Sequence, residues 1–226
     1  MDIVSYLLGK QSSGGGGLNW SAIGYSEEPQ HVTDTYNEIE SDYNYSKNIL
    51  NSWDATQTNL NAKFQNNKDL KYMPLVDTSN VVNLQATFEG CSNLYNVPLL
   101  NTSNVTTFYR SFKGCSVLAE IPQFNTQNVT TFYQAFMSCS ALTTVPVLNT
   151  SKVAGTISLQ GVFANCAHLT DTSLDNILQM CINATSYGGT KTLSQLGLVS
   201  TYHPVSRIQA LPHYQDFIDA GWTIGY

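Results

Sequence analysis

Few side chains in this sequence could carry out catalysis, and none stands in a known catalytic pattern. No HExxH sequence, CxxC pair or GxSxG sequence occurs, and the histidines are scattered: His31, His168, His203 and His213. The glycine run at 14–17 lacks the lysine that a phosphate-binding loop needs. We therefore expect no enzyme, no catalytic residue, no metal site and no cofactor.

The charge of the chain argues against two classes of partner. Its net charge is −6, and only 12% of the residues are charged, against a usual ~25%. An acidic chain without a basic stripe is not expected to bind nucleic acid or anionic membranes. No segment is apolar for long enough to cross a bilayer, so membrane insertion is not expected either. A polar, nearly uncharged surface suits neutral partners such as glycans, and it also suits close subunit packing in a capsid or fibre.

The elements that would position a binding surface come from a 24-residue repeat. Its landmarks return in four consecutive units: Leu70, Leu94, Leu118 and Leu142; Pro74, Pro98, Pro122 and Pro146; Thr78, Thr102, Thr126 and Thr150; Val81, Val105, Val129 and Val153. In the first three units a phenylalanine follows, at Phe88, Phe112 and Phe136, with a cysteine three residues after each. In the fourth unit Phe163 and Cys166 come three residues later, after an insertion. A leucine-led period of about 20–29 residues is typical of a leucine-rich solenoid.

Within each unit we predict a strand, a turn and a helix. The repeated proline marks the end of a short strand, because proline cannot donate to a strand ladder. Asn101 to Asn104 then supply side chains that turn the chain. Phe108, Phe112 and Cys115 have the i, i+4, i+7 spacing of one helix face. The predicted fold class is thus α/β, a leucine-rich repeat solenoid with a short parallel strand and a helix in each unit. We expect the five cysteines to be reduced, buried apolar fillers.

Two short motifs recur within residues 70–170. The first stands at Asp77–Val81, Asn101–Thr106 and Asn125–Thr130, and the second at Gly90–Ser92 and Gly114–Ser116. They resemble the BspA-like leucine-rich repeats, which have a DTSNVT stretch followed by a phenylalanine and a GCS turn. Where the family usually has methionine before its phenylalanine, this chain has Thr87, Ser111 and Ala135. A solenoid displays its specificity at the variable positions that flank each strand, so we expect a partner-binding surface there. These candidate partner-binding residues are Lys71, Tyr72, Tyr95, Asn96, Glu120, Gln123, Thr143 and Thr144.

The first residues look like a docking peptide on a tether. Its apolar side chains are Ile3, Val4, Tyr6, Leu7 and Leu8, followed by serine and glycine as far as Gly17. The run has no cationic residues before it and is too short for a signal peptide. A short apolar peptide on a flexible tether suits insertion into a groove of a larger assembly; a terminus that is frayed or folded onto its own domain is the alternative.

Between this tether and the repeats, residues 18–69 are predicted to be helical. Apolar positions from Val32 to Phe64 alternate spacings of four and three, and Gln30–Leu70 contains no glycine or proline. Residues 30–67 could form one coiled-coil stem, which would suit a trimer, or two helices that cap the first unit. After the repeats (70–168), we expect residues 169–226 to form a helical C-terminal cap. Thr172 and Asp175 resemble a capping box there, and Gly221 suits the end of a helix.

The two ends of the chain have distinctive sequences, the opening MDIVSYLLGK and the closing IQALPHYQDFIDAGWTIGY. They look like the ends of repeat proteins encoded in phages and prophages of gut bacteria. It implies a virion appendage, a tail or head fibre-like protein that recognises a host surface glycan or protein and attaches to other virion proteins through its N-terminus. The alternatives are a virion decoration protein without host binding and a bacterial surface adhesin. The expected location is thus the virion, or otherwise the bacterial cell surface.

Overall fold

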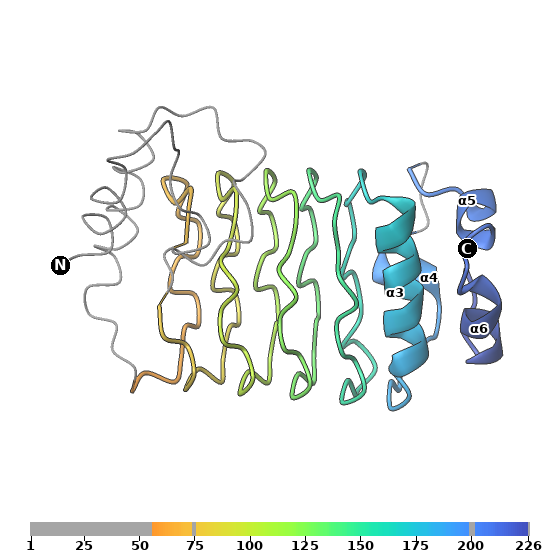
Figure 1. Ribbon diagram of the computed structural model, residues 1–226, viewed down its shortest axis with the longest axis horizontal. Helices are drawn as coiled ribbons and strands as arrows, with labels where there is room; N and C mark the ends of the chain where they lie inside the picture. Colours follow the sequence, from red (N-terminus) through yellow and green to blue (C-terminus); the bar gives the residue numbers. More distant parts are fainter. Residues whose placement is uncertain (1–55, 74–75, 199–201, 226) are drawn as a thin grey trace, which may run out of the picture.

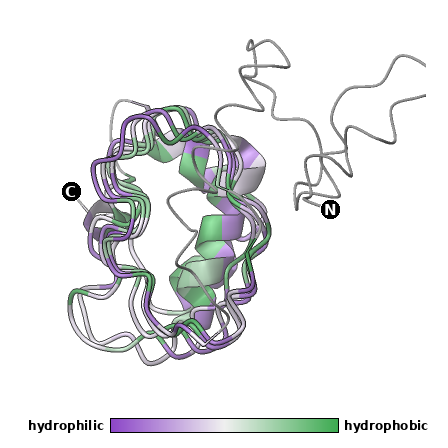
Figure 2. Ribbon diagram, turned by 90° about the vertical axis from the view of Figure 1, so that its left-hand side faces the viewer, coloured by the Kyte–Doolittle hydropathy of each residue, from purple (hydrophilic) through white to green (hydrophobic). Residues whose placement is uncertain are grey.

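The computed structural model describes residues 56–73, 76–198 and 202–225. Between Asn59 and Cys166 the chain winds into a stack of coils, each coil being one repeat, and the helices gather at the far end (Figure 1). Viewed along the stack, the coils share nearly the same outline (Figure 2). The apolar side chains of each coil point inward, so the core runs through the whole stack.

Neighbouring coils are joined by single parallel bridges. One row of bridges links Asn59, Asn83, Thr107 and Thr131, each residue one 24-residue repeat after the last. A second row contains Tyr72 with Asn96 and Glu120 with Thr144. All of these are isolated bridges, and the described residues contain no longer strand. The predicted parallel register is therefore present, but the short strands are reduced to single residues.

The predicted helix in each unit is wrong, and with it the strand-plus-helix solenoid. Residues 84–91 and their equivalents form turns, in which alternate N–H groups bond to the next coil: Ala86 N to Tyr109 O (2.9 Å), Phe88 N to Ser111 O (2.8 Å) and Gly90 N to Lys113 O (2.7 Å). The N–H groups between them bond three residues back, as from Thr87 to Leu84 O (3.2 Å). A helix would instead bond every N–H to the carbonyl four residues earlier.

The backbone angles give the physical reason. Each turn contains a left-handed residue at the same place: Ala62, Ala86, Arg110 and Gln134, with φ between 51° and 54°, then Gly161 at 64°. A second left-handed residue follows four positions later, as at Gly90 (77°) and Gly114 (78°). A left-handed residue breaks a right-handed helix. Repeating it twice per coil aims alternate N–H groups at the neighbouring coil.

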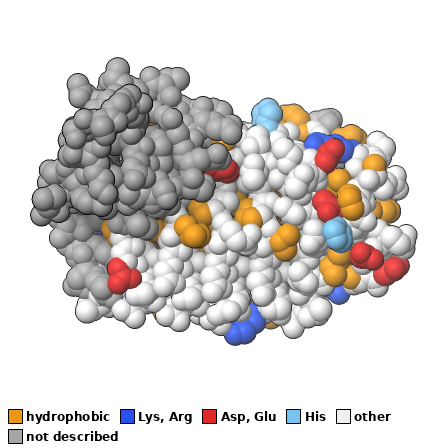
Figure 3. All heavy atoms as spheres, viewed as in Figure 1, with side chains coloured by type: hydrophobic (Ala, Val, Ile, Leu, Met, Phe, Trp, Pro, Cys, Tyr) orange, Lys and Arg blue, Asp and Glu red, His pale blue; other side chains and the backbone are white. Residues whose placement is uncertain are grey.

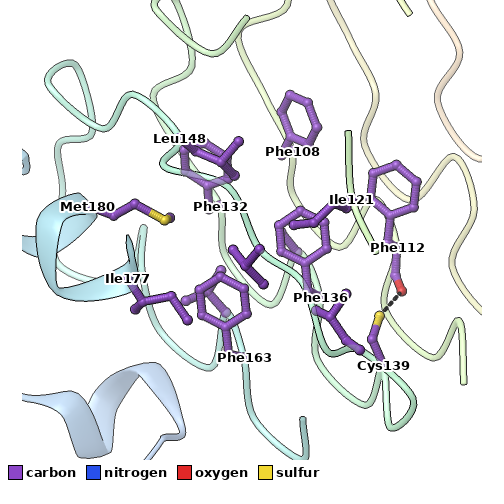
Figure 4. Packing of buried hydrophobic residues seen from close by; sticks show 14 of the residues in the cluster. Phe108, Phe112, Ile121, Phe132, Phe136, Cys139, Leu148, Phe163, Ile177 and Met180 are labelled. Carbon is purple, nitrogen blue, oxygen red and sulfur yellow. Dashed lines mark hydrogen bonds between the residues drawn. The ribbon is translucent and has the colours of Figure 1, made fainter. Parts of the chain in front are cut away.

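The spacing that suggested a helix still marks the buried face correctly. Phe108, Phe112 and Cys115 are each fully buried. The phenylalanine rings of successive coils stack in a column, Phe64, Phe88, Phe112, Phe136 and Phe163, with centroids 5.1–5.6 Å apart. Figure 4 shows part of this column beside Ile177 and Met180 of the C-terminal region. Phe112 thus lies between Phe88 and Phe136.

The predicted turns are also confirmed. Asn101 Oδ1 accepts a hydrogen bond from Ser103 N (3.2 Å), and Asn149 Oδ1 accepts one from Ser151 N (3.0 Å). Beside each turn a buried threonine hydroxyl donates to a carbonyl of the next coil, as Thr102 Oγ1 does to Asn125 O (2.9 Å). These bonds satisfy polar groups inside the stack.

The stack begins one coil earlier than the sequence pattern predicted. Residues 59–66 form a turn like those of the repeats, with Leu60 and Phe64 fully buried against the next coil. The described residues 56–67 contain no helix, so the end of the predicted helical seam is wrong. The signal was present, since Leu60 and Phe64 lie 24 residues before Leu84 and Phe88. The rest of the seam and the docking peptide lie outside the described residues.

Helices occupy the region where a helical cap was predicted. They are α3 (Asp171–Asn183), α4 (Leu193–Leu196), α5 (Val205–Gln209) and α6 (Tyr214–Asp219). The α3 helix runs alongside the last coil of the stack (Figure 1), which belongs to the fourth repeat unit. There Ser173 Oγ accepts from Val145 N (2.9 Å), and Asn176 Nδ2 donates to Val145 O (2.9 Å). These side chains take the place of the strand that the next coil would have supplied.

The ends of these helices differ in part from the predicted ones. The N-cap of α3 is Thr170, whose Oγ1 accepts from Ser173 N (3.2 Å), so the predicted capping box at Thr172 is wrong. Gly221 follows the end of α6 with φ 82°, as predicted. After α6 the chain returns to the start of α4, where Thr223 pairs with Thr192 in a parallel bridge.

Candidate functional site

The reactive side chains of the described residues do not form a catalytic or metal-binding cluster. Nowhere in these residues do three or more histidine, cysteine, aspartate or glutamate side chains come together in a way that could hold a metal ion. One histidine–carboxylate pair occurs, His213 and Asp175, in which Nδ1 donates to Oδ2 (2.7 Å) and the His213 backbone N donates to Oδ1 (2.9 Å). Asp175 therefore orients the ring with its N–H on Nδ1. No hydroxyl or thiol of the described residues bonds to Nε2, so the pair has no nucleophile beside it.

The thiols are buried away from any reacting partner. Burial raises the pKa of Cys91 and of Cys166 to about 12. It raises the pKa of Cys115, Cys139 and Cys181 as well. A thiol with so high a pKa is protonated at neutral pH and is a poor nucleophile.

Four of the predicted partner-binding residues lie in the second row of bridges, namely Tyr72, Asn96, Glu120 and Thr144. Several of the predicted residues are engaged within the stack. Tyr72 and Asn96 are buried, and Asn96 Oδ1 accepts from Val97 N (2.7 Å). The Tyr72 ring also stacks on Tyr95, with centroids 5.9 Å apart. Thr143 Oγ1 donates to Ala119 O (3.1 Å) in the preceding coil.

The remaining candidates are exposed to different degrees. Lys71 and Glu120 are half-buried, while Gln123 and Thr144 are exposed. The Gln123 side chain donates to Val147 O (2.9 Å), so it too is bonded to the next coil. The candidate docking residues Ile3, Val4, Tyr6, Leu7 and Leu8 lie outside the described residues.

A different surface places aromatic, cationic and amide groups together. We call it the Tyr–Arg patch: Tyr109, Arg110, Tyr133 and Gln134, all half-buried. The two tyrosine rings stack with centroids 4.9 Å apart. The Arg110 guanidinium lies over both rings, at 5.3 Å from Tyr109 and 5.7 Å from Tyr133, and Arg110 Nε donates to Gln134 Oε1 (3.1 Å).

A shallow groove continues from this patch toward the C-terminal region. It has a volume of about 440 Å³. Its lining contains no charged side chain and consists of Gln134, Met137, Gln160, Gly161, Ala164, Thr190, Thr192, Ser194, Gln195 and Gly197. Gln134 belongs to both the patch and the groove, so the two form one continuous surface. Hydroxyl and amide groups can each donate and accept, which suits a ligand rich in hydroxyl groups.

The surroundings of the stack carry little charge. On the face seen in Figure 3, few charged side chains lie over the coils, and most of those visible lie over the C-terminal helices. None of the described helices is long and apolar enough to cross a membrane.

Comparison with known proteins identifies a family. The family described as Mycoplasma protein of unknown function, DUF285, matches residues 58–177, more than half of the chain. The chain belongs to the DUF285 family. Its matched range begins beside the first described coil, at Asn59. DUF285 is related to the BspA-like proteins, so the predicted resemblance is confirmed at that level.

The other comparisons give no closer relative. No curated protein matches the chain. No solved structure matches it either. The DUF285 match says nothing of leucine-rich repeats or of a phage origin.

The groove of this DUF285 chain forms where the repeat changes. Gly161 is the equivalent of Gln134 one unit later, and its N–H bonds to Gln195 O in the α4 segment (2.7 Å), whereas Gln134 N bonds to Gln160 O of another coil. The sequence held a signal for the patch, because FYR and FYQ follow Thr107 and Thr131 at the same place in two units. These residues were assigned to helices, whereas the structure exposes them on turns.

Proposed function

We propose that this chain is a non-enzymatic recognition module that binds a polar ligand, most simply a surface glycan, through the Tyr–Arg patch and its groove. One observation carries the proposal: Gln134 joins a stacked Tyr109–Tyr133 pair to a groove whose uncharged lining includes glutamine, threonine and serine side chains. Aromatic rings supply apolar contact and the amides supply directional bonds.

The coil stack supports this role by holding the surface rigid. Each patch residue lies on a turn whose backbone bonds to the next coil, as Arg110 N does to Tyr133 O (2.9 Å) and Gln134 N to Gln160 O (3.0 Å). A surface that is already ordered loses little conformational entropy when a ligand binds. The low charge of the chain, 12% of residues, also favours a ligand recognised mainly by hydrogen bonds.

A binding role without catalysis fits the state of the reactive groups. The thiols are buried with raised pKa values, and the His213–Asp175 pair has no neighbouring nucleophile in the described residues. The groove lining contains no carboxylate, thiol or imidazole that could act as an acid, base or nucleophile.

Attachment of the module to a virion stays a prediction, because residues 1–17, on which it depends, lie outside the described residues. The same holds for a trimeric stem. Two alternatives to the virion appendage stay open. A bacterial adhesin would use the same binding face but would be carried on a cell surface, whereas a virion decoration protein would need no face that binds a host.

The proposal is tested by binding of the purified chain to an array of neutral and acidic glycans. Gln160→Trp should block the groove, because Gln160 lines it and is exposed. Gln209→Trp is the matched control, since Gln209 is an exposed residue at the end of α5 and does not line the groove. We expect glycans that bind the unmodified chain to be lost with Gln160→Trp and retained with Gln209→Trp. The absence of any bound glycan, or equal binding by both variants, would overturn the proposal.

A further inference from the structure

The two arginines of the chain are used in different ways. Arg207 pairs with Asp171 (2.6 Å) and donates to Leu169 O (2.8 Å). Arg110 pairs with no carboxylate anywhere in residues 56–73, 76–198 and 202–225. Glu89 pairs with Lys113 of the same coil as Arg110 (3.5 Å) and accepts from Gln65 (2.9 Å). Within the described residues, no carboxylate therefore compensates the positive charge of Arg110.

The position of Arg110 is fixed by its neighbours. Its guanidinium is held over two stacked tyrosine rings, and only its Nε is bonded to a described side chain, Gln134 Oε1. The terminal nitrogens, Nη1 and Nη2, make no hydrogen bond with the described residues. A planar arginine fork of this kind matches the two oxygens of a carboxylate. Part of the ordering cost of the long side chain is thereby met before a ligand arrives.

We infer that the ligand is an acidic glycan, with one sugar carboxylate bound by Arg110 and the hydroxyl groups of neighbouring sugars bound in the groove. This inference rests on the proposed function and adds the ligand class to it. The groove lining beyond Gln134 is neutral, which matches an oligosaccharide with hydroxyl groups along its length. A single cation at one end matches a singly charged group there, not a polyanion such as a nucleic acid.

The carboxylate itself is tested with paired probes on the full chain. Sialyllactose is compared with lactose, and an oligogalacturonate with its methyl ester, because each pair differs chiefly in the acid group. We expect at least one of the acidic probes to bind 10-fold or more tightly than its neutral partner, and this preference to shrink as salt is raised. A sulfated oligosaccharide is included to separate carboxylate from sulfate recognition; tighter binding of the sulfated probe would overturn the carboxylate assignment.

Three variants assign the effect to one residue. Arg110→Gln removes the positive charge and should abolish the preference for the acidic probe. Arg110→Lys keeps the charge but lacks the planar guanidinium, so it should retain part of that preference. Lys113→Gln removes a cation of the same coil that is already paired with Glu89, and it should leave the preference unchanged. Melting curves establish that each variant is folded, and if Arg110→Gln is not, the probe pairs and the salt titration on the unmodified chain still decide.

The two proposals fail in different ways. Equal binding of acidic and neutral probes, or an acidic preference that survives in folded Arg110→Gln, overturns the acidic-glycan inference and leaves the recognition module standing. Binding of none of the glycans, neutral or acidic, removes both.

Discussion

The Sγ atom of Cys139 donates a hydrogen bond to the carbonyl oxygen of Phe112 in the preceding coil, over 3.1 Å (Figure 4). The same bond recurs along the stack, from Cys91 to Phe64, Cys115 to Phe88 and Cys166 to Phe136, at 3.0–3.1 Å. The residues that the sequence suggested as apolar fillers are buried as expected, and they also satisfy a carbonyl of the neighbouring coil. Cysteine suits this place because it is small and its thiol is a weak donor.

The thiols are expected to resist alkylation in the folded protein. Reaction requires the thiolate, and burial raises the pKa of Cys91 and Cys166 to about 12. At pH 8 we expect almost no iodoacetamide adducts on the native chain, and five adducts after denaturation without reductant, read by intact mass. Rapid labelling of the native protein would contradict the burial, and fewer than five adducts after denaturation would reveal a disulfide.

The phenylalanine column should dominate the stability of the stack. Phe112 is fully buried between Phe88 and Phe136, with ring centroids at 5.1 and 5.5 Å. Phe112→Ala should therefore lower the free energy of unfolding by about 3–5 kcal/mol, through lost burial and a cavity. Leu99→Ala is the control, since Leu99 is 57% exposed, and should change it by less than about 0.5–1 kcal/mol. Chemical denaturation measures both, and a similar loss for the two variants would rule out the column as the main support.

Sequence reasoning located the buried residues better than the backbone that carries them. The spacing of Phe108, Phe112 and Cys115 fits a helix face, but a turn with left-handed residues at Arg110 and Gly114 buries the same three side chains. Nothing in the sequence marks Arg110, Ala86 or Gln134 as left-handed, because these residue types rarely adopt positive φ. Only the bonds to neighbouring coils compensate for that conformation, and they depend on the assembled stack.

The burial of some predicted partner-binding residues could not be foreseen for a related reason. Variable positions beside a strand usually face outward, which favours Tyr95 and Asn96, yet Asn96 is buried and its Oδ1 accepts from Val97 N. Tyr109 and Arg110 were assigned to a helix, so their stacking on the equivalent residues 24 positions later could not be foreseen. Two side chains on turns meet only when the turns themselves are in register.

The left-handed alanines predict a substitution that stabilises the protein. Ala62 has φ 54°, a conformation that costs an alanine about 1–2 kcal/mol relative to glycine. Ala62→Gly removes this strain, and the greater freedom of glycine in the unfolded chain offsets about 0.4–1 kcal/mol of the gain. We expect a net stabilisation of up to about 1.5 kcal/mol by chemical denaturation. Ala167→Gly is the control, because Ala167 does not have a positive φ, and this substitution should destabilise the chain. If both variants lose stability, the left-handed conformation of Ala62 does not strain the protein.

Acid should weaken the attachment of the C-terminal helices through His203. This residue is 2% exposed, and its Nε2 donates to Cys166 O (2.7 Å). Its Nδ1 lies 3.1 Å from Arg207 Nη1. Arginine can only donate, so Nδ1 must accept and the ring is neutral. Burial lowers the pKa of His203, and the nearby charges of Arg207 and His168 lower it further.

The sign of the pH effect follows from that lowered pKa. The unfolded chain has the ordinary histidine pKa, about 6.5, and so binds a proton before the folded chain does. The contribution of His203 to stability is therefore complete above the unfolded pKa and is lost as pH falls through the lower folded pKa. We expect the melting temperature to decrease as pH falls below about 6.5, and His203→Gln to show a smaller decrease, because glutamine can still donate to Cys166 O but does not titrate. An identical pH profile for the two proteins would show that another group controls acid stability.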